Sequence, residues 1–136
     1  MKKLISLTFA ALLMLSSSQW AHANEFTDLR AQLSAARESL VTLLVNKDKR
    51  GADQQKLVKD TADAVSAHLA KMKAPAGKEA QFKELVESWN AFKKTREVEL
   101  VPAILAGKDD EAKKLAGGIQ KERITRCQQL VGELGG

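Results

Sequence analysis

The apolar residues of this chain recur at steps of three and four, and this spacing limits the fold more than any other feature. The first stripe has the a/d pattern of a coiled coil and predicts a helix of about 20 residues; it comprises Phe26, Leu29, Leu33, Ala36, Leu40 and Leu43. Three further stripes of the same period run through residues 58–72, 82–100 and 112–130. No segment alternates apolar and polar residues as a half-buried strand would. The sequence therefore predicts an all-α fold of four helices.

Short breaks separate the four stripes. They are residues 46–51 (NKDKRG), residues 74–77 (APAG) and the pair Ala106-Gly107. Proline stops a helix because it lacks a backbone donor, and Gly107 suits the end of a helix. Short connections place successive helices side by side in opposite directions, so we expect an antiparallel up-down-up-down four-helix bundle. One such domain accounts for residues 24–136.

The first 23 residues have the pattern of a secretory signal peptide. Lys2 and Lys3 precede an apolar run at residues 4–15, and residues 21–23 (AHA) form a cleavage site. The run is shorter than the roughly 20 apolar residues that a membrane-spanning helix needs. We therefore expect cleavage after Ala23, export to the periplasm, and no membrane span in the mature chain.

Charge and motifs exclude several classes of function. Cleavage would lower the net charge from +5 to +3, because it removes Lys2 and Lys3. The remaining charges are mixed, and no basic stripe alternates with aromatic residues, so nucleic acid is not an expected partner. The chain has no G-x-S-x-G, no H-E-x-x-H and no glycine-rich phosphate loop. We expect a non-catalytic protein that holds no cofactor.

Arg96 breaks the third stripe. It stands at the next stripe position after Trp89 and Phe92, and Glu99 follows it by three residues. Burying an unpaired guanidinium is costly, so Arg96 needs a partner. One explanation is an ion pair with Glu99 or with a carboxylate of the last helix such as Glu122, or a side chain that extends its charged end to solvent. The other is a small anionic ligand, which arginine binds through a two-pronged fork.

Two glycines interrupt the last stripe. Gly117 and Gly118 fall in the middle of the expected fourth helix, where each costs about 1 kcal/mol relative to alanine. They either open a pocket across from Arg96 or let two helices approach closely. Pro102 should bend or split the third helix near Val101. The predicted ligand site lies between the third and fourth helices and comprises Trp89, Arg96, Glu99, Gly117, Gly118, Glu122 and Arg123.

Three other side chains suggest chemistry. His68 and Met72 stand one helical turn apart and are the only histidine and methionine of the mature chain. They are weak candidates for a metal site, beside an ordinary structural role. Cys127 is the only cysteine; it is either a small core residue or the site of a disulfide between two chains.

The second half of the chain resembles a known family. Trp89, Phe92, Arg96 and Leu100, followed by residues 105–109 (LAGKD) and 111–112 (EA), resemble the second helical hairpin of the four-helix-bundle sensor domain of methyl-accepting chemotaxis receptors. This resemblance implies a periplasmic sensor fold that binds small ligands or partner proteins and often dimerises. We expect no second membrane span and no signalling coiled coil in this chain. A stand-alone module would bind a small anionic ligand, a membrane receptor or a second copy of itself.

Two alternatives stay open. The last helix is similar in spacing to that of soluble periplasmic b-type cytochromes with a four-helix bundle, which implies an electron-transfer or haem protein. That family binds haem through a histidine and a methionine, and the matching positions here hold Cys127 and Arg30. The other alternative is a purely structural bundle that dimerises through an exposed apolar seam or through Cys127.

Overall fold

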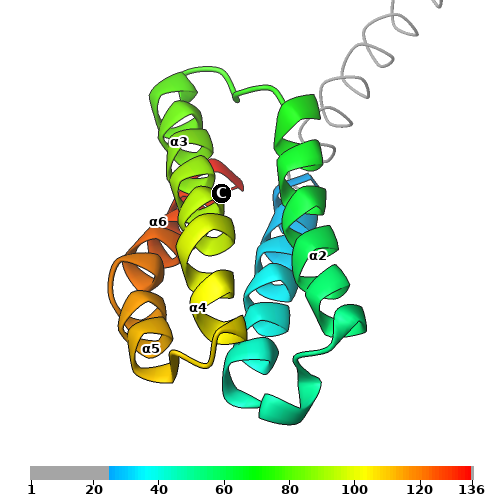
Figure 1. The fold of residues 1–136 in the computed structure, drawn as a ribbon. Helices are drawn as coiled ribbons and strands as arrows, with labels where there is room; N and C mark the ends of the chain where they lie inside the picture. The colour runs from blue at the N-terminus through cyan, green and yellow to red at the C-terminus, as the bar shows by residue number, and fades with distance from the viewer. Residues whose placement is uncertain (1–24, 136) are drawn as a thin grey trace, which may run out of the picture.

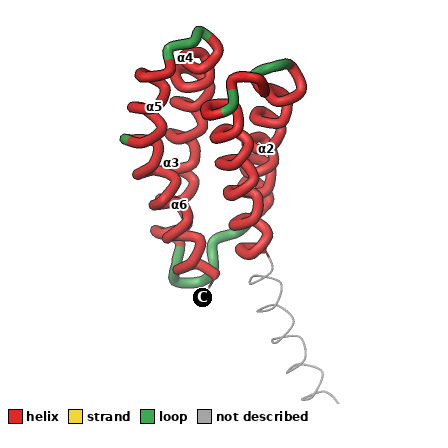
Figure 2. Tube along the Cα trace, turned by 90° about the horizontal axis from the view of Figure 1, so that it is seen from below, coloured by secondary structure: helices red, strands yellow, loops and turns green. Residues whose placement is uncertain are grey.

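The computed structural model describes residues 25–135, so the expected signal peptide, residues 1–23, lies outside the described residues. Within residues 25–135 the chain forms helices and turns and no strand (Figure 1; Figure 2). The predicted all-α fold with four long helical segments is confirmed. None of the helices in residues 25–135 has the length and apolar character that crossing a membrane requires.

The four segments have the following bounds. The first helix covers residues 25–45 and is followed by the short η1, Lys47–Lys49. The second segment is α2, Ala52–Lys71. The third combines α3, Glu79–Thr95, with η2, Arg96–Leu100, and α4, Val101–Leu105. The fourth consists of α5, Asp109–Gly117, and α6, Ile119–Gly135.

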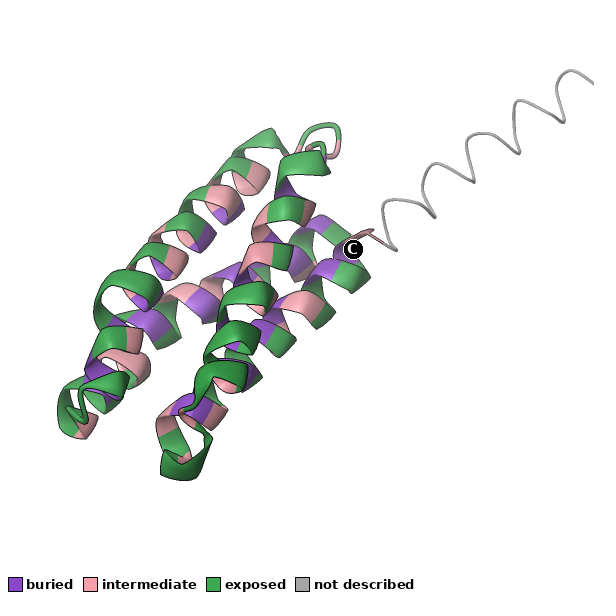
Figure 3. Cartoon of the chain, turned by 45° about the vertical axis from the view of Figure 1, so that its right-hand side comes forward, coloured by how far each residue is buried: buried purple, intermediate pink, exposed green. Residues whose placement is uncertain are grey.

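The segments lie in two adjacent pairs. The first helix lies beside α2, whereas α3 and α4 lie beside α5 and α6, and both views show this grouping (Figure 1; Figure 2). Each stripe residue predicted for the first helix, from Phe26 to Leu43, is buried. Figure 3 shows that buried residues gather on the helix faces that point toward one another. The apolar period thus sets which face of each helix packs inward.

The third segment ends as its sequence predicts. Gly107 has φ +75° and follows α4. Its N–H donates to the Ile104 carbonyl at 3.1 Å, and the Lys108 N–H donates to the Ala103 carbonyl at 2.9 Å. These two bonds form a Schellman motif, which needs a left-handed residue and therefore favours glycine.

Pro102 is preceded by a widened helical turn, and the helix is not interrupted at Val101. The five residues of η2 form a π turn, in which the Val101 N–H donates to the Arg96 carbonyl. Proline lacks an N–H and its ring crowds the preceding turn, and a widened turn relieves that crowding. The expected irregularity is present, but the helix continues through it to Leu105.

The fourth segment is not one continuous helix, and that expectation is wrong. The chain leaves helical geometry at Gly118, between α5 and α6. A Cβ atom at Gly118 would lie 2.8 Å from the Lys114 carbonyl oxygen, which is too close for any side chain. Gly117 differs, because no atom beyond its chain neighbours and its own helix backbone lies within 4 Å of the position its Cβ would take.

The core consists of two clusters. The large cluster comprises Phe26, Leu29, Leu33, Ala36, Ala62, Val65, Leu69, Met72, Leu85, Trp89, Phe92, Ile124, Cys127, Leu130, Val131 and Leu134. The small cluster comprises Leu40, Leu43, Val58, Leu100, Ala103, Ile104 and Ala112. On each helical segment the residues of the two clusters occupy separate stretches, and the boundaries between these stretches lie at one level of the bundle. Ser39, Arg96 and Gln120 are buried at this boundary. We call these three residues the polar layer.

Candidate functional site

Arg96 lies at the start of the π turn and is 1% exposed. One terminal nitrogen donates to the Ala36 carbonyl at 2.7 Å, and the other donates to the Val58 carbonyl at 2.6 Å. The guanidinium therefore joins the third segment to both the first helix and α2. Its second nitrogen also lies 3.5 Å from the Ser39 hydroxyl. Because the partners are neutral, they satisfy its hydrogen bonds without neutralising its charge.

The carboxylates expected to pair with Arg96 do not do so. Glu99 and Glu122 are both exposed, and none of the ion pairs found among residues 25–135 includes Arg96. Burial lowers the pKa of Arg96 to about 10, against a small opposing effect of Glu97. The group still carries its charge at neutral pH. A buried positive charge therefore lies in the core with no carboxylate against it.

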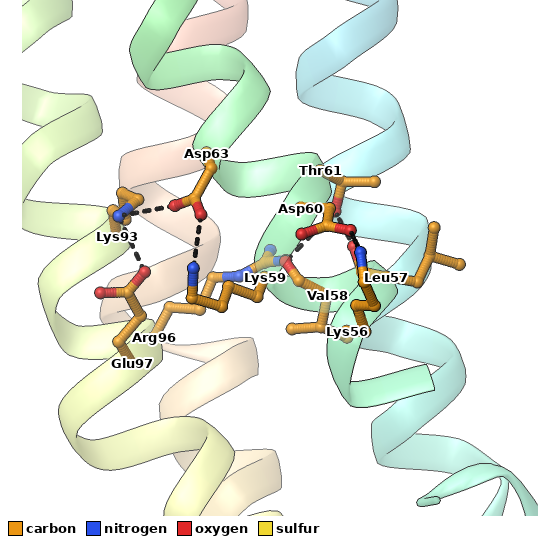
Figure 4. Close-up of polar contacts among 10 residues, drawn as sticks. All are labelled: Lys56, Leu57, Val58, Lys59, Asp60, Thr61, Asp63, Lys93, Arg96 and Glu97. Carbon is orange, nitrogen blue, oxygen red and sulfur yellow. Dashed lines mark hydrogen bonds and ion pairs between the residues drawn. The ribbon is translucent and has the colours of Figure 1, made fainter. Parts of the chain in front are cut away.

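The other residues of the predicted site are not gathered around Arg96. Trp89 is fully buried in the large cluster, where its ring lies 5.4 Å from that of Phe92 and its N–H donates to the Ser66 hydroxyl. Arg123 donates to the Thr95 hydroxyl at 2.8 Å and so ties α6 to α3. Gly117 and Gly118 lie on the α5–α6 side, whereas Arg96 reaches toward the first helix and α2 (Figure 4). The predicted residues thus occupy separate places.

A groove does open beside Arg96, between α2 and the α3–η2 segment (Figure 4). Four basic residues and two acidic residues are among those that line it: Lys56, Lys59, Lys93, Arg96, Asp63 and Glu97. Gln55, Val58 and Val101 complete the lining. We call this the cationic groove, because its basic side chains outnumber its acidic ones.

A chain of ion pairs crosses the cationic groove. The Asp63 carboxylate accepts from Lys59 at 2.8 Å and lies 3.2 Å from the Lys93 ammonium, which also pairs with Glu97 at 2.8 Å (Figure 4). The hydrogen bond from Lys59 is the main cause of a lowered pKa at Asp63, and the bond to Glu97 is the main cause of a raised pKa at Lys93. Asp63 and Lys93 are therefore charged at neutral pH. Of these ion pairs, Lys93–Asp63 is the one that joins the two walls, and the hydrogen bond from Arg96 to the Val58 carbonyl joins them as well.

Apart from Arg96, none of these residues was predicted as part of a site. One signal was available: Lys59 and Asp63, like Lys93 and Glu97, stand four residues apart on one helix face. The contact between Lys93 and Asp63 had no such signal, because it depends on how α2 and α3 are placed in space.

Arg50 is a second residue whose role the sequence did not indicate. It lies in residues 46–51, which were predicted only as a break between two helices, yet its side chain is 16% exposed. It donates to the carbonyls of Leu43, Leu44 and Ile104 at 2.8 to 3.1 Å, and it pairs with Asp109 at 3.2 Å. Arg50 therefore caps the first helix and links it to the ends of α4 and α5, next to the small cluster.

The two weak metal candidates lie in ordinary surroundings. His68 is half-buried, and its Nδ1 lies 2.7 Å from the Gln32 side-chain oxygen. Met72 is buried in the large cluster. Within residues 25–135 no three side chains of histidine, cysteine, aspartate or glutamate are grouped so as to hold a metal ion.

Cys127 is fully buried in the large cluster. Burial raises the pKa of its thiol to about 12, so the reactive thiolate is scarce at neutral pH. A disulfide to a second chain would require α6 to move away from the core. The structure thus places Cys127 as a core residue.

No family model, curated protein or solved structure matches this chain. The resemblances to chemotaxis receptors and to b-type cytochromes stay predictions. The cationic groove is therefore interpreted from its own geometry and charge.

Proposed function

We propose that this chain is an exported, non-catalytic binding protein whose cationic groove takes a small anionic ligand. One observation carries this function: Arg96 keeps its charge inside the protein while only neutral oxygens accept its hydrogen bonds. Lys56, Lys59 and Lys93 add positive charge along the same groove. A carboxylate entering there would meet ammonium donors at the opening and a favourable field from Arg96 below.

We further propose that the chain forms an antiparallel up-down-up-down bundle and is located in the periplasm after removal of residues 1–23. Its role there would be sensor-like, comparable with that of chemotaxis-receptor domains. The short connections between the helical segments support the bundle topology. A membrane receptor or a second copy of the chain would then be the partner that responds to the bound ligand.

Asp63 and Glu97 set how strongly an anion is held. They occupy Lys59 and Lys93 in the free protein, so a ligand must compete with these internal carboxylates. Removing the charge of Asp63 frees Lys59 and leaves Lys93 with Glu97 as its one remaining carboxylate partner. Asp63→Asn should therefore raise the affinity for anions, which is the opposite of what a purely structural ion pair would do.

Calorimetric titration of short carboxylates, amino acids and aromatic acids tests the groove at low ionic strength, where charge contributes most. We expect Lys93→Met to weaken binding about tenfold, because it removes one charged hydrogen bond. Asp63→Asn should tighten binding several-fold.

Lys83→Met is the matched control. Lys83 also pairs with a glutamate four residues on, Glu87, but it is exposed outside the groove. Equal affinity losses in Lys83→Met and Lys93→Met would mean that net charge, not the groove, holds the anion. Failure of every anion to bind at millimolar concentration would refute the proposal.

A further inference from the structure

A second groove lies between the first helix and the α5–α6 segment. Its floor is apolar and includes Leu40, Leu44, Phe92, Leu100 and Ile124, which come from both sides of the polar layer. Gly117 lies in its wall, and the space where its side chain would begin is open. We call this the apolar groove. It shares none of its lining residues with the cationic groove.

The rim of the apolar groove carries three exposed cations, Arg37, Lys113 and Lys121, and no acidic residue lines it. None of the ion pairs found among residues 25–135 includes any of these three side chains. In the cationic groove, by contrast, each lysine has a carboxylate partner. The apolar groove therefore combines an unfilled apolar surface with basic groups that have no ion-pair partner in the described chain.

We propose that the apolar groove binds a fatty acid of medium chain length. An alkyl chain would cover the floor, and the carboxylate would lie among Arg37, Lys113 and Lys121, where it gains charged hydrogen bonds. The cavity volume of about 300 Å³ is at the lower end of the range for small-molecule sites. That size suits a chain of eight to ten carbons better than a bulkier or two-chain lipid. This site is separate from the anion site proposed above.

The probes are hexanoate, octanoate and decanoate below the concentration at which they form micelles, titrated against the full chain by calorimetry. Burial of each added CH₂ raises affinity by up to about fourfold, so affinity should rise steeply from hexanoate to decanoate. Decanol has the same chain without the charge, and it should bind at least tenfold more weakly than decanoate. Equal affinity for all three acids, or for decanol and decanoate, would overturn the proposal.

Gly117→Leu locates the site. Its side chain would enter open space and fill the groove, so we expect at least a tenfold loss of decanoate affinity with unchanged circular dichroism. Gly51→Leu is the matched control, because Gly51 also has open space around its Cβ position and lies outside the groove. Decanoate should bind Gly51→Leu and Lys93→Met as it binds the unaltered chain.

Three further outcomes would contradict a fatty-acid site in the apolar groove. One is unchanged decanoate affinity in Gly117→Leu. Another is binding to anionic lipid vesicles with no saturable binding of dissolved decanoate, which would assign the three cations to a membrane surface instead. Loss of binding in Lys93→Met but not in Gly117→Leu would place decanoate in the cationic groove and would likewise refute the second site.

Discussion

The large cluster lies between long, regular helices, whereas the small cluster packs the ends of the first helix and α2 against short and irregular segments. α3 and α6 have 17 residues each and pack around Trp89 and Phe92. The small cluster contains only aliphatic side chains and is bounded by the π turn, by the five residues of α4 and by the nine of α5. Apolar packing therefore holds both ends of the molecule, and at the small-cluster end the contacts of Arg50 add to it.

The polar layer marks where the two regions meet. Arg96 begins the π turn, and Gln120 follows the break at Gly118 and donates to the Phe92 carbonyl at 2.9 Å. The two grooves open beside this level, one lined by Arg96 and the other by Gln120. Buried polar groups must be bonded in fixed geometry, so they interrupt close apolar packing. Both grooves thus lie where the core changes from one cluster to the other.

Arg50→Met should have the largest effect, and it should destabilise the small-cluster end of the molecule more than the large-cluster end. It removes a charged donor from three carbonyls and from Asp109, and we expect a loss of about 2–3 kcal/mol in the free energy of unfolding. Because Arg50 lies beside the small cluster, amide hydrogen exchange should speed up most in α4 and α5 and least in α3 and α6. Equal acceleration in all four helices would show that the two clusters unfold as one unit.

Gly118→Ala should have the next largest effect. Its Cβ would lie 2.8 Å from the Lys114 carbonyl, so the α5–α6 junction must shift, at a cost of about 1–3 kcal/mol. Gly117→Ala is the control; it meets no atom within 4 Å and should leave stability unchanged or raise it by up to about 1 kcal/mol. Urea unfolding of the two variants distinguishes these effects. Equal stabilities of the two variants would mean that the α5–α6 junction does not require a glycine at position 118.

Asp109→Asn should have the smallest effect, and this effect depends on pH. The hydrogen bond from Lys47, followed by that from Arg50, lowers the pKa of Asp109 below its usual 3.8. A lowered pKa in the folded state means that ionised Asp109 stabilises the fold above about pH 4, and that this contribution is lost as the pH falls further. Thermal unfolding should show Asp109→Asn below the unaltered protein at pH 7, with the gap closing toward pH 2.

Asp110→Asn makes the same charge change one residue further on, at an exposed position. It should leave the unfolding temperature nearly unchanged at every pH. If the two variants behaved alike, the contacts of Asp109 with Lys47 and Arg50 would not stabilise the end of the small cluster.

Local periodicity made much of the fold predictable. The stripe from Phe26 to Leu43 and the stop at Gly107 depend on neighbours a few residues away, and both are found as expected. The partners of Arg96 were not predictable, because they are backbone carbonyls on two other helices and carry no side-chain signal. The same holds for Lys93 and Asp63, which meet only after α2 and α3 pack. The break at Gly118 was visible as a costly glycine pair, but its form depends on the approach of the Lys114 carbonyl.

The central claim is that the cationic groove holds an anion. Amide NMR spectra recorded during a titration with malonate or succinate, at constant ionic strength, test it most directly. We expect saturable shifts in residues 55–63 and 93–101, reduced in Lys93→Met and enlarged in Asp63→Asn. Saturable shifts that gather elsewhere, or no saturable shifts with any of the carboxylates, would contradict it.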